Sequence, residues 1–87
     1  MELILEEGLI FGSKYYTAYP SFDWVLNNKK SNQYWILMED WCIDTFGRSG
    51  TDNMPGVYTP NARWYINNSK FWFKEQKDLE WFLLKWQ

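Results

Sequence analysis

The clearest pattern of apolar and polar positions lies at the C-terminal end of the chain. Between residues 75 and 86, apolar side chains recur at spacings of three and four residues: Leu79, Phe82, Leu83 and Trp86. This spacing predicts an amphipathic helix whose apolar stripe faces the core. On the same helical wheel, Trp81 and Leu84 lie roughly 140 to 200° from Leu79. Either a loop or the N-terminal segment covers these two side chains, or they contact a partner.

Two β-prone runs precede this helix, residues 63 to 66 and residues 70 to 74. Both contain aromatic side chains, which suit a pleated surface. Asn67-Asn68-Ser69 between them tolerates a tight turn, so the two runs are predicted to pair as an antiparallel hairpin. The same three residues match the N-glycosylation pattern, but the chain shows no secretory signal and the turn interpretation is favoured.

Side chains alternate between the two faces of a strand, and this divides the second run of the hairpin. Phe71 and Phe73 fall on one face, which is predicted to face the core. Trp72 falls on the other face, together with the flanking Lys70 and Lys74. Trp72 is therefore predicted to be exposed.

A second amphipathic helix is predicted over residues 32 to 46. Six side chains share one broad arc of its helical wheel: Tyr34, Trp35, Met38, Trp41, Cys42 and Phe46. Ser31 or Asn32 is expected to cap its N-terminus. Gly47 stands where a glycine in the left-handed conformation commonly ends a helix. Both ends of this helix are therefore marked in the sequence.

Two isoleucines of this helix, Ile36 and Ile43, lie outside the main arc. Their positions predict that two sides of the helix are covered by other parts of the chain. A strand over residues 34 to 43 is the alternative, because the run is short and rich in tryptophan.

The N-terminal part of the chain contains two extended runs, residues 3 to 5 or beyond and residues 14 to 19. Gly8 and Gly12 punctuate these runs, and Pro20 ends the second one. A hairpin or a pair of edge strands is predicted.

The remaining segments are short or irregular. Ser21 is suited to cap a short helix that ends at the polar run of residues 27 to 32. Residues 47 to 62 contain glycines and prolines with little periodicity, which predicts a functional or mobile loop. Residues 48 to 52 superficially resemble a phosphate cradle, but the P-loop spacing and its lysine are missing. Phosphate binding is therefore disfavoured.

Length and cysteine content limit the class of fold. The 87 residues contain one cysteine, Cys42, and no histidine. Neither an internal disulfide framework nor a zinc site of cysteine and histidine ligands is expected. We predict a single α+β domain over residues 1 to 87. Its small antiparallel sheet, made of the N-terminal extended pair and the C-terminal hairpin, packs on one side against a central and a C-terminal helix.

The lack of histidine also removes the usual pairs of nucleophile and base found in hydrolases. The best remaining pair for acid–base or cation chemistry is Asp40 and Asp44, which a helix places one turn apart on the same face. Acidic pairs of this kind usually form a solvated face. We therefore predict no enzymatic activity, no catalytic residue, no cofactor and no bound metal.

Charge is divided unevenly along the chain. Residues 1 to 45 hold three lysines and seven acidic residues, whereas residues 46 to 87 hold six basic and four acidic residues, within a net charge of −2. The basic residues are scattered, so duplex nucleic acid is disfavoured as a partner. No apolar run approaches the roughly 18 to 20 residues that cross a bilayer, and the acidic N-terminus lacks signal-peptide features. A cytoplasmic setting without a membrane partner is expected.

Aromatic side chains are the outstanding feature of the composition, with seven tryptophans, six tyrosines and six phenylalanines. Two interpretations are open. In the first, these rings staple a small core in place of disulfides. In the second, rings that the core cannot shelter form an apolar surface patch that another molecule covers.

Two segments combine aromatic residues at fixed spacings: Trp35-x-x-Met38-x-x-Trp41-Cys42-x-x-x-Phe46-Gly47 and Phe71-Trp72-Phe73-Lys74-x-x-x-Asp78-x-x-x-Phe82-x-Leu84-x-Trp86. Both resemble segments of small uncharacterised proteins of large tailed bacteriophages, especially marine ones. The resemblance covers about half of the chain and brings no established activity. It implies an accessory factor of the host cytoplasm that binds a host or phage protein.

We expect a non-enzymatic interaction factor that binds a protein partner or a second copy of itself. The expected partner-binding surface joins aromatic and apolar anchors to basic neighbours. Its residues are Trp72, Lys74, Lys77, Trp81 and Leu84. The alternative is a ligand-binding module in which sugars or nucleobases stack on exposed rings. Four side chains form a candidate platform if they share one sheet face: Tyr15, Tyr19, Trp64 and Trp72.

Overall fold

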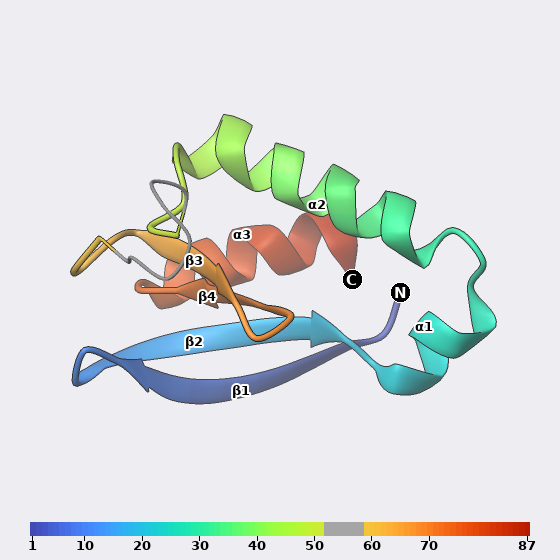
Figure 1. Ribbon diagram of the computed structural model, residues 1–87, viewed down its shortest axis with the longest axis horizontal. Coiled ribbons are helices and arrows are strands. Elements are labelled where there is room, and N and C mark those ends of the chain that lie inside the picture. Colours follow the sequence, from blue (N-terminus) through green and yellow to red (C-terminus); the bar gives the residue numbers. More distant parts are fainter. Residues whose placement is uncertain (52–58) are drawn as a thin grey trace.

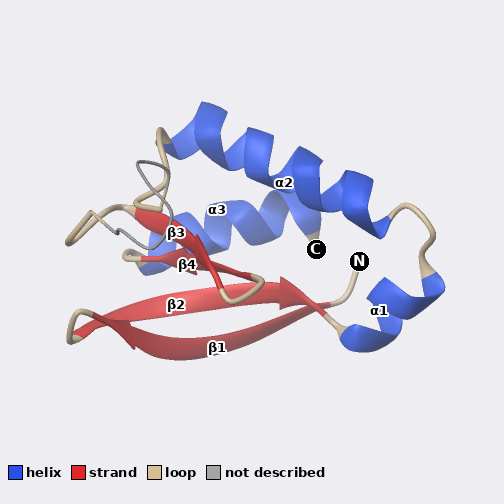
Figure 2. Cartoon of the chain, viewed as in Figure 1, coloured by secondary structure: helices blue, strands red, loops and turns tan. Residues whose placement is uncertain are grey.

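A computed structural model describes residues 1 to 51 and 59 to 87. Four antiparallel strands form one sheet in the order β1-β2-β4-β3. The elements in chain order are β1 (Leu3–Ile10), β2 (Ser13–Pro20), α1 (Phe22–Asn27), α2 (Ser31–Phe46), β3 (Trp64–Asn67), β4 (Lys70–Phe73) and α3 (Gln76–Trp86). Helices α2 and α3 lie over one face of the sheet, and α1 follows the end of β2 (Figure 1, Figure 2). The predicted α+β fold is confirmed.

Both hairpins are closed by two-residue turns in which φ is positive. Phe11 and Gly12 join β1 to β2 with φ of 50° and 78°, and Asn68 and Ser69 join β3 to β4 with φ of 58° and 59°. Positive φ at both central residues gives the turn that matches the twist of paired strands. The two predicted hairpins are therefore confirmed, although Gly8 lies inside β1 and does not interrupt it.

The core lies between the sheet and the two long helices. Phe71 and Phe73 of β4 are fully buried there. The ring centroid of Phe82 on α3 lies 5.0 Å from that of Phe71 and 5.2 Å from that of Phe73. Met38 and Cys42 of α2 belong to the same cluster. This packing confirms the predicted core face of β4.

The opposite face of the sheet is covered in part by the chain just before β3. Tyr15 and Tyr65 are buried there with their ring centroids 5.3 Å apart. The Tyr15 hydroxyl donates to the carbonyl oxygen of Ala62 at 2.8 Å, and the Tyr65 hydroxyl donates to the carbonyl oxygen of Thr59. The predicted loop of residues 47 to 62 is thus anchored on the sheet at its second end. Its central residues lie outside the described part of the chain.

The starts of the first two helices agree only in part with the prediction. Ser21 caps α1 as expected, because its hydroxyl accepts a backbone N–H of the first turn at 3.2 Å. The N-cap of α2 is Lys30, which makes no side-chain capping bond. The prediction of Ser31 or Asn32 as the cap is therefore wrong. The Asn28 side chain accepts the Lys30 N–H at 2.9 Å, which turns the chain into the helix earlier than expected.

The outer side of α2 is open. Ile36 is 57% exposed and Ile43 is 40% exposed, so the prediction that two sides of this helix are covered is wrong. The helix packs through one arc, in which Met38, Cys42 and Phe46 are buried. Helix α3 lies beside it over the sheet (Figure 1), and the described residues form no further long helix that could cover the remaining side.

Candidate interaction surfaces

The outward side of α3 carries two large apolar side chains. Leu79 and Phe82 are buried on the inward side, as predicted. Trp81 is 51% exposed and Leu84 is 86% exposed. Lys77 is exposed on the same helix and, by its helical spacing, lies on the same side. Three of the five predicted partner-binding residues therefore share this side of α3.

Trp81 borders an aromatic seam between α2 and α3. Its ring centroid lies 6.4 Å from that of Trp41 and 5.9 Å from that of Phe46. The Trp41 ring lies a further 6.4 Å from Trp86, at the end of α3. Edge-to-face contacts of this kind are favourable and fix ring orientation. The seam thus holds Trp81 in place while about half of its surface faces solvent.

The facing side of α2 adds apolar and acidic side chains. Leu37, one turn before Trp41, is 54% exposed. Asp40 and Asp44 are exposed on the same helix. We define the helical face as the apolar residues Leu37, Trp41, Trp81 and Leu84 with the exposed charged rim residues Asp40, Asp44, Lys77, Glu80 and Lys85. This face is the largest grouping of the predicted site residues in the described chain.

Trp72 lies on the opposite face of the sheet and is half-buried. Its indole N–H donates to the Asn67 carbonyl oxygen at 2.9 Å. The indole rests on β1, where a Cβ added to Gly8 would lie 2.6 Å from ring atom Cζ3. The sheet therefore separates Trp72 from Trp81 and Leu84, because alternation along β4 turns it away from the helices.

Lys74 is exposed just after β4 and, with Lys77, borders a hollow of about 260 Å³. One wall of the hollow is an ion pair in which Arg63 Nε lies 2.8 Å from Asp78 Oδ2 and Arg63 Nη2 lies 3.1 Å from Asp78 Oδ1. Asp78 is buried, and its hydrogen bond raises the pKa of Arg63. This ion pair was not predicted from the sequence, where its one signal was an acidic residue in the first turn of α3.

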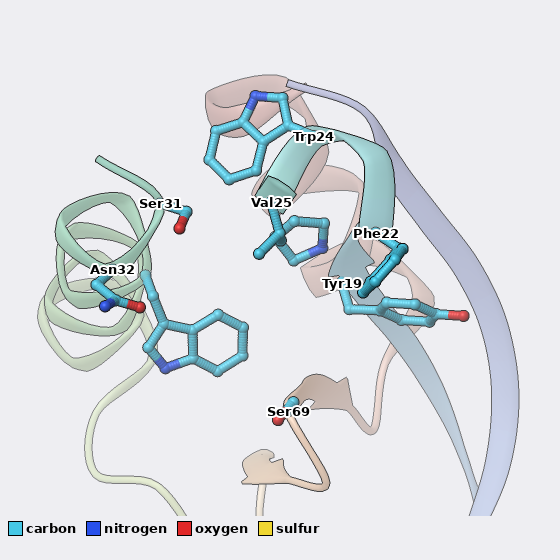
Figure 3. Close-up of a pocket in the computed structure, with 9 residues that line it drawn as sticks. Tyr19, Phe22, Trp24, Val25, Ser31, Asn32 and Ser69 are labelled. Atoms are coloured by element: carbon cyan, nitrogen blue, oxygen red, sulfur yellow. The ribbon is translucent and has the colours of Figure 1, made fainter. Parts of the chain in front are cut away.

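A cleft of about 470 Å³ opens where α1, the start of α2 and the end of β2 meet (Figure 3). Its lining includes rings and uncharged polar groups, among them Tyr19, Phe22, Trp24, Ser31, Asn32 and Ser69. The six residues of α1 include none that is buried, and Phe22 is 73% exposed. This cleft was not predicted from the sequence, where its signal was a short helix with four large apolar residues.

The stacking platform expected from four aromatic residues is not formed. Trp64 is buried on the helix side of the sheet, where its indole N–H donates to the Gly47 carbonyl oxygen at 2.8 Å. Tyr15 is buried on the other side. Strand register separates these rings, since Trp64 pairs with the core residue Phe73. Of the four, Tyr19 reaches the cleft beside α1.

Reactive groups are few among the described residues. Cys42 is buried, and burial raises the pKa of its thiol, which disfavours the reactive thiolate. Across residues 1 to 51 and 59 to 87, no group of three histidine, cysteine or acidic residues is placed to hold a metal ion. Over the same ranges, no helix has both the length and the apolar character to cross a membrane. The described surfaces are suited to stacking and to burial of apolar groups.

Comparisons with known proteins leave the function to be inferred from these surfaces. The resemblance of the two quoted segments to tailed-phage proteins stays a prediction. No known protein-family model, curated protein or solved structure matches the chain.

Proposed function

We propose that this chain is a small non-enzymatic interaction factor that binds another protein through the helical face. The observation that carries the proposal is the exposure of Trp81 and Leu84 beside a packed aromatic seam. Exposed apolar clusters with a charged rim are typical of protein–protein contact sites.

The helical face has the features of a binding hot spot. Trp81 is held by ring contacts on one side, so little conformational freedom is lost when a partner covers the other side. Leu84 is 86% exposed, and its burial would stabilise a complex by roughly 1.5 to 3 kcal/mol. The charged rim restricts the partners that fit.

The resemblance to accessory proteins of tailed bacteriophages supports the same class of function. A phage-encoded factor of this kind acts in the host cytoplasm by binding a host or phage protein. Trp72 and Lys74 were expected in the contact surface, but they lie apart from the helical face. The proposal therefore places the contact on Trp81, Leu84 and Lys77.

Affinity capture from cells that make the chain tests this proposal, with mass spectrometry as the readout. The test variant is Leu84→Glu, which places a charge on the helical face. The matched control is Leu9→Glu, the same change at a 70% exposed position of β1. We expect a protein that is retained by the parent and by Leu9→Glu but lost from Leu84→Glu. Equal recovery by the two variants would contradict the proposal.

A second candidate function rests on the cleft beside α1. Its volume of about 470 Å³ falls within the roughly 300 to 1,000 Å³ of small-molecule sites. The side chains of Ser31, Asn32 and Ser69 line it without a hydrogen-bond partner among the described residues. Phe22 and Tyr19 add ring surfaces (Figure 3). These groups suit a ligand with a flat ring and hydroxyl or amide groups, such as a sugar or a nucleobase.

Tryptophan fluorescence reports on this cleft, because Trp24 lines it. We expect emission to change on titration with oligosaccharides or mononucleotides. Phe22→Ala is expected to weaken binding about tenfold through lost stacking. Leu26→Ala is the control, because Leu26 is 66% exposed on α1 and lies outside the cleft lining. Unchanged emission with both ligand classes, or equal weakening by the two variants, would exclude this function.

A further inference from the structure

Strand β1 forms a long edge of the sheet. It stands at one end of the strand order and has eight residues, whereas β3 at the other end has four. No described element lies beyond β1 (Figure 1). Leu5 of this strand is 46% exposed and Leu9 is 70% exposed. A long, apolar edge strand is a template for pairing with another chain.

Among the described residues, every second residue of β1 has backbone groups that face the free edge. The Ser21 N–H donates to the Glu2 carbonyl oxygen at 2.9 Å, at the start of the β1–β2 pair. In an antiparallel pair, residues that exchange both hydrogen bonds alternate with residues that exchange none. The even-numbered residues of β1 therefore bond to β2. The residues whose N–H and C=O groups point outwards are Leu3, Leu5, Glu7 and Leu9.

The apolar side chains of β1 are placed symmetrically around Glu7. Leu5 and Leu9 lie two residues on either side of it, and Ile4 and Ile10 lie three residues on either side. Two antiparallel β1 strands centred on Glu7 therefore set leucine against leucine and isoleucine against isoleucine. This register also brings together the outward backbone groups of the two strands, which a shift by one residue would not. A shift by two residues in either direction sets Glu7 against a leucine and loses the leucine pairs.

We propose that β1 pairs with β1 of a second copy of this chain, in the register centred on Glu7. The two-fold axis passes between the two Glu7 residues at right angles to the sheet, so the helices of both copies lie on the same side. A two-fold interface must be complementary to itself, and the symmetric placement of apolar residues in β1 meets this condition. The inference goes beyond the proposed function, because it uses the edge of the sheet and not the helical face.

The helical layer leaves room for this pairing. Helix α3 packs on β2 and β4, so two β1 strands separate the α3 helices of the two copies. Three strand spacings of about 4.8 Å put about 14 Å or more between these helices, and packed helices approach to about 8 to 10 Å. Leu5 lies on the helix side of β1, because it pairs with the core residue Ala18. Leu5 and Leu9 of both copies thus line the strip of sheet between the two helices.

Glu7 limits the strength of the dimer. At the two-fold axis, Glu7 of one copy faces Glu7 of the other, and like charges directly opposite each other weaken a strand pair. Within each copy, Lys14 Nζ lies 3.2 Å from Glu7 Oε1, which offsets part of the repulsion. Charged residues on an edge strand commonly restrain its pairing with other chains. The dimer of the parent is therefore expected to be weaker than that of a chain with a neutral residue at this position.

Amide hydrogen exchange of the full chain, followed residue by residue by NMR, tests the pairing without a variant. The N–H groups of Leu5, Glu7 and Leu9 are expected to exchange more slowly as the concentration rises towards about 1 mM, because the second copy accepts their hydrogens. The N–H groups of Ile4 and Glu6 bond to β2 and are expected to be protected at every concentration. A dimer in which Leu5, Glu7 and Leu9 stay unprotected would overturn the proposal.

Substitutions of Glu7 test the register by sedimentation equilibrium. Glu7→Gln removes the like charges at the axis and should lower the dissociation constant of the dimer about threefold. Glu7→Lys should pair poorly with itself but form a heterodimer with the parent, because a lysine then faces a glutamate. The matched control is Glu80→Lys, the same change at an exposed position of α3, which should mix with the parent without preference.

The register is contradicted if the two lysine variants mix with the parent to the same extent. Circular dichroism verifies that each variant folds. If Glu7→Lys does not fold, Glu7→Gln decides, and a dissociation constant no lower than that of the parent would contradict the register.

Two further variants separate this inference from the proposed function. Leu9→Glu sets a charge against Leu5 of the second copy and should weaken the dimer at least about tenfold. Leu84→Glu lies on the helical face and should leave the dimer unchanged, whereas capture of another protein should respond to these two variants in the opposite way. A dimer lost on Leu84→Glu but kept on Leu9→Glu would overturn the pairing of β1.

The identity of the occupant is also tested. A parent and a Glu7→Gln chain that both stay monomeric at about 1 mM would overturn the second copy as the partner of β1. Protection of the β1 edge only in the presence of a captured protein would assign the edge to another chain, with the same consequence. Neither result bears on the helical face, which is judged by the capture experiment.

Discussion

At the residue scale, many aromatic side chains are fixed by bonds within the chain. The indole N–H of Trp64 donates to the Gly47 carbonyl oxygen at 2.8 Å, and the Tyr15 hydroxyl donates to the Ala62 carbonyl oxygen at 2.8 Å. For these residues, stabilisation of a small core explains why the side chains are aromatic. It does not explain Trp81, which is 51% exposed. The two interpretations of the composition therefore apply to different residues.

Tyr15→Phe is expected to lower the free energy of unfolding by about 1 kcal/mol, because the partly buried Ala62 carbonyl oxygen loses its donor. Burial raises the pKa of Tyr15 from 10.0 to about 12. The unfolded chain therefore loses this proton at a lower pH than the folded chain does. The contribution of the buried, protonated Tyr15 hydroxyl to the free energy of unfolding is therefore complete below about pH 10, and it is lost as the pH rises towards about 12.

Denaturant unfolding of the parent and of Tyr15→Phe, at about pH 8 and about pH 11, measures both effects. The parent should lose stability between the two conditions by more than the variant does, because only the parent carries the Tyr15 hydroxyl. An identical pH dependence of the two proteins would contradict the burial of this group.

Cys42 is expected to resist alkylation in the folded protein. It is buried between α2 and the sheet, and burial raises the pKa of its thiol. Mass spectrometry after iodoacetamide treatment should show slow labelling in buffer, limited by unfolding, and fast labelling in denaturant. Fast labelling of the native chain would show that α2 does not pack on the sheet as described.

At the scale of elements, the sequence predicts structure where the pattern is local. Residues 67 to 69 contain the turn of one hairpin, and helical spacing reveals both faces of α3. The unpredicted features depend on distant parts of the chain. The burial of Asp78 is accompanied by an ion pair with Arg63, which lies just before β3. The exposure of Ile36 reflects that no described element covers that side of α2. Trp72 is half-buried because Gly8 of β1 leaves room for its ring.

Gly8→Ala is expected to destabilise the protein by about 1 to 3 kcal/mol, the usual cost of overpacking. The new Cβ would lie 2.6 Å from Cζ3 of Trp72, so the indole has to move from β1. In a Trp72→Ala background the same change should cost much less, since the ring is gone. Denaturant unfolding of the four proteins of this cycle gives the coupling. Equal costs in both backgrounds would show that Trp72 does not rest on Gly8.

At the scale of the whole molecule, the arrangement of layers decides which side chains meet solvent. The sheet is covered by helices on one face and in part by the chain before β3 on the other, so the outer side of the helical layer stays open. The position of Trp81 and Leu84 on this side follows from the spacing in α3. The position of Asp40 and Asp44 on the same side of the molecule could not be predicted, because it depends on how α2 and α3 pack together.

The most direct test of the account is the affinity of Trp81→Ala for the partner of the helical face. The affinity of the variant is expected to fall at least about thirtyfold, which is a loss of about 2 kcal/mol or more in binding free energy. The variant should still fold, because the Trp81 side chain is 51% exposed in the single chain, although the loss of its ring contacts with Trp41 and Phe46 lowers the thermal midpoint. A folded Trp81→Ala that binds as tightly as the parent would contradict the assignment of the helical face as the interaction surface.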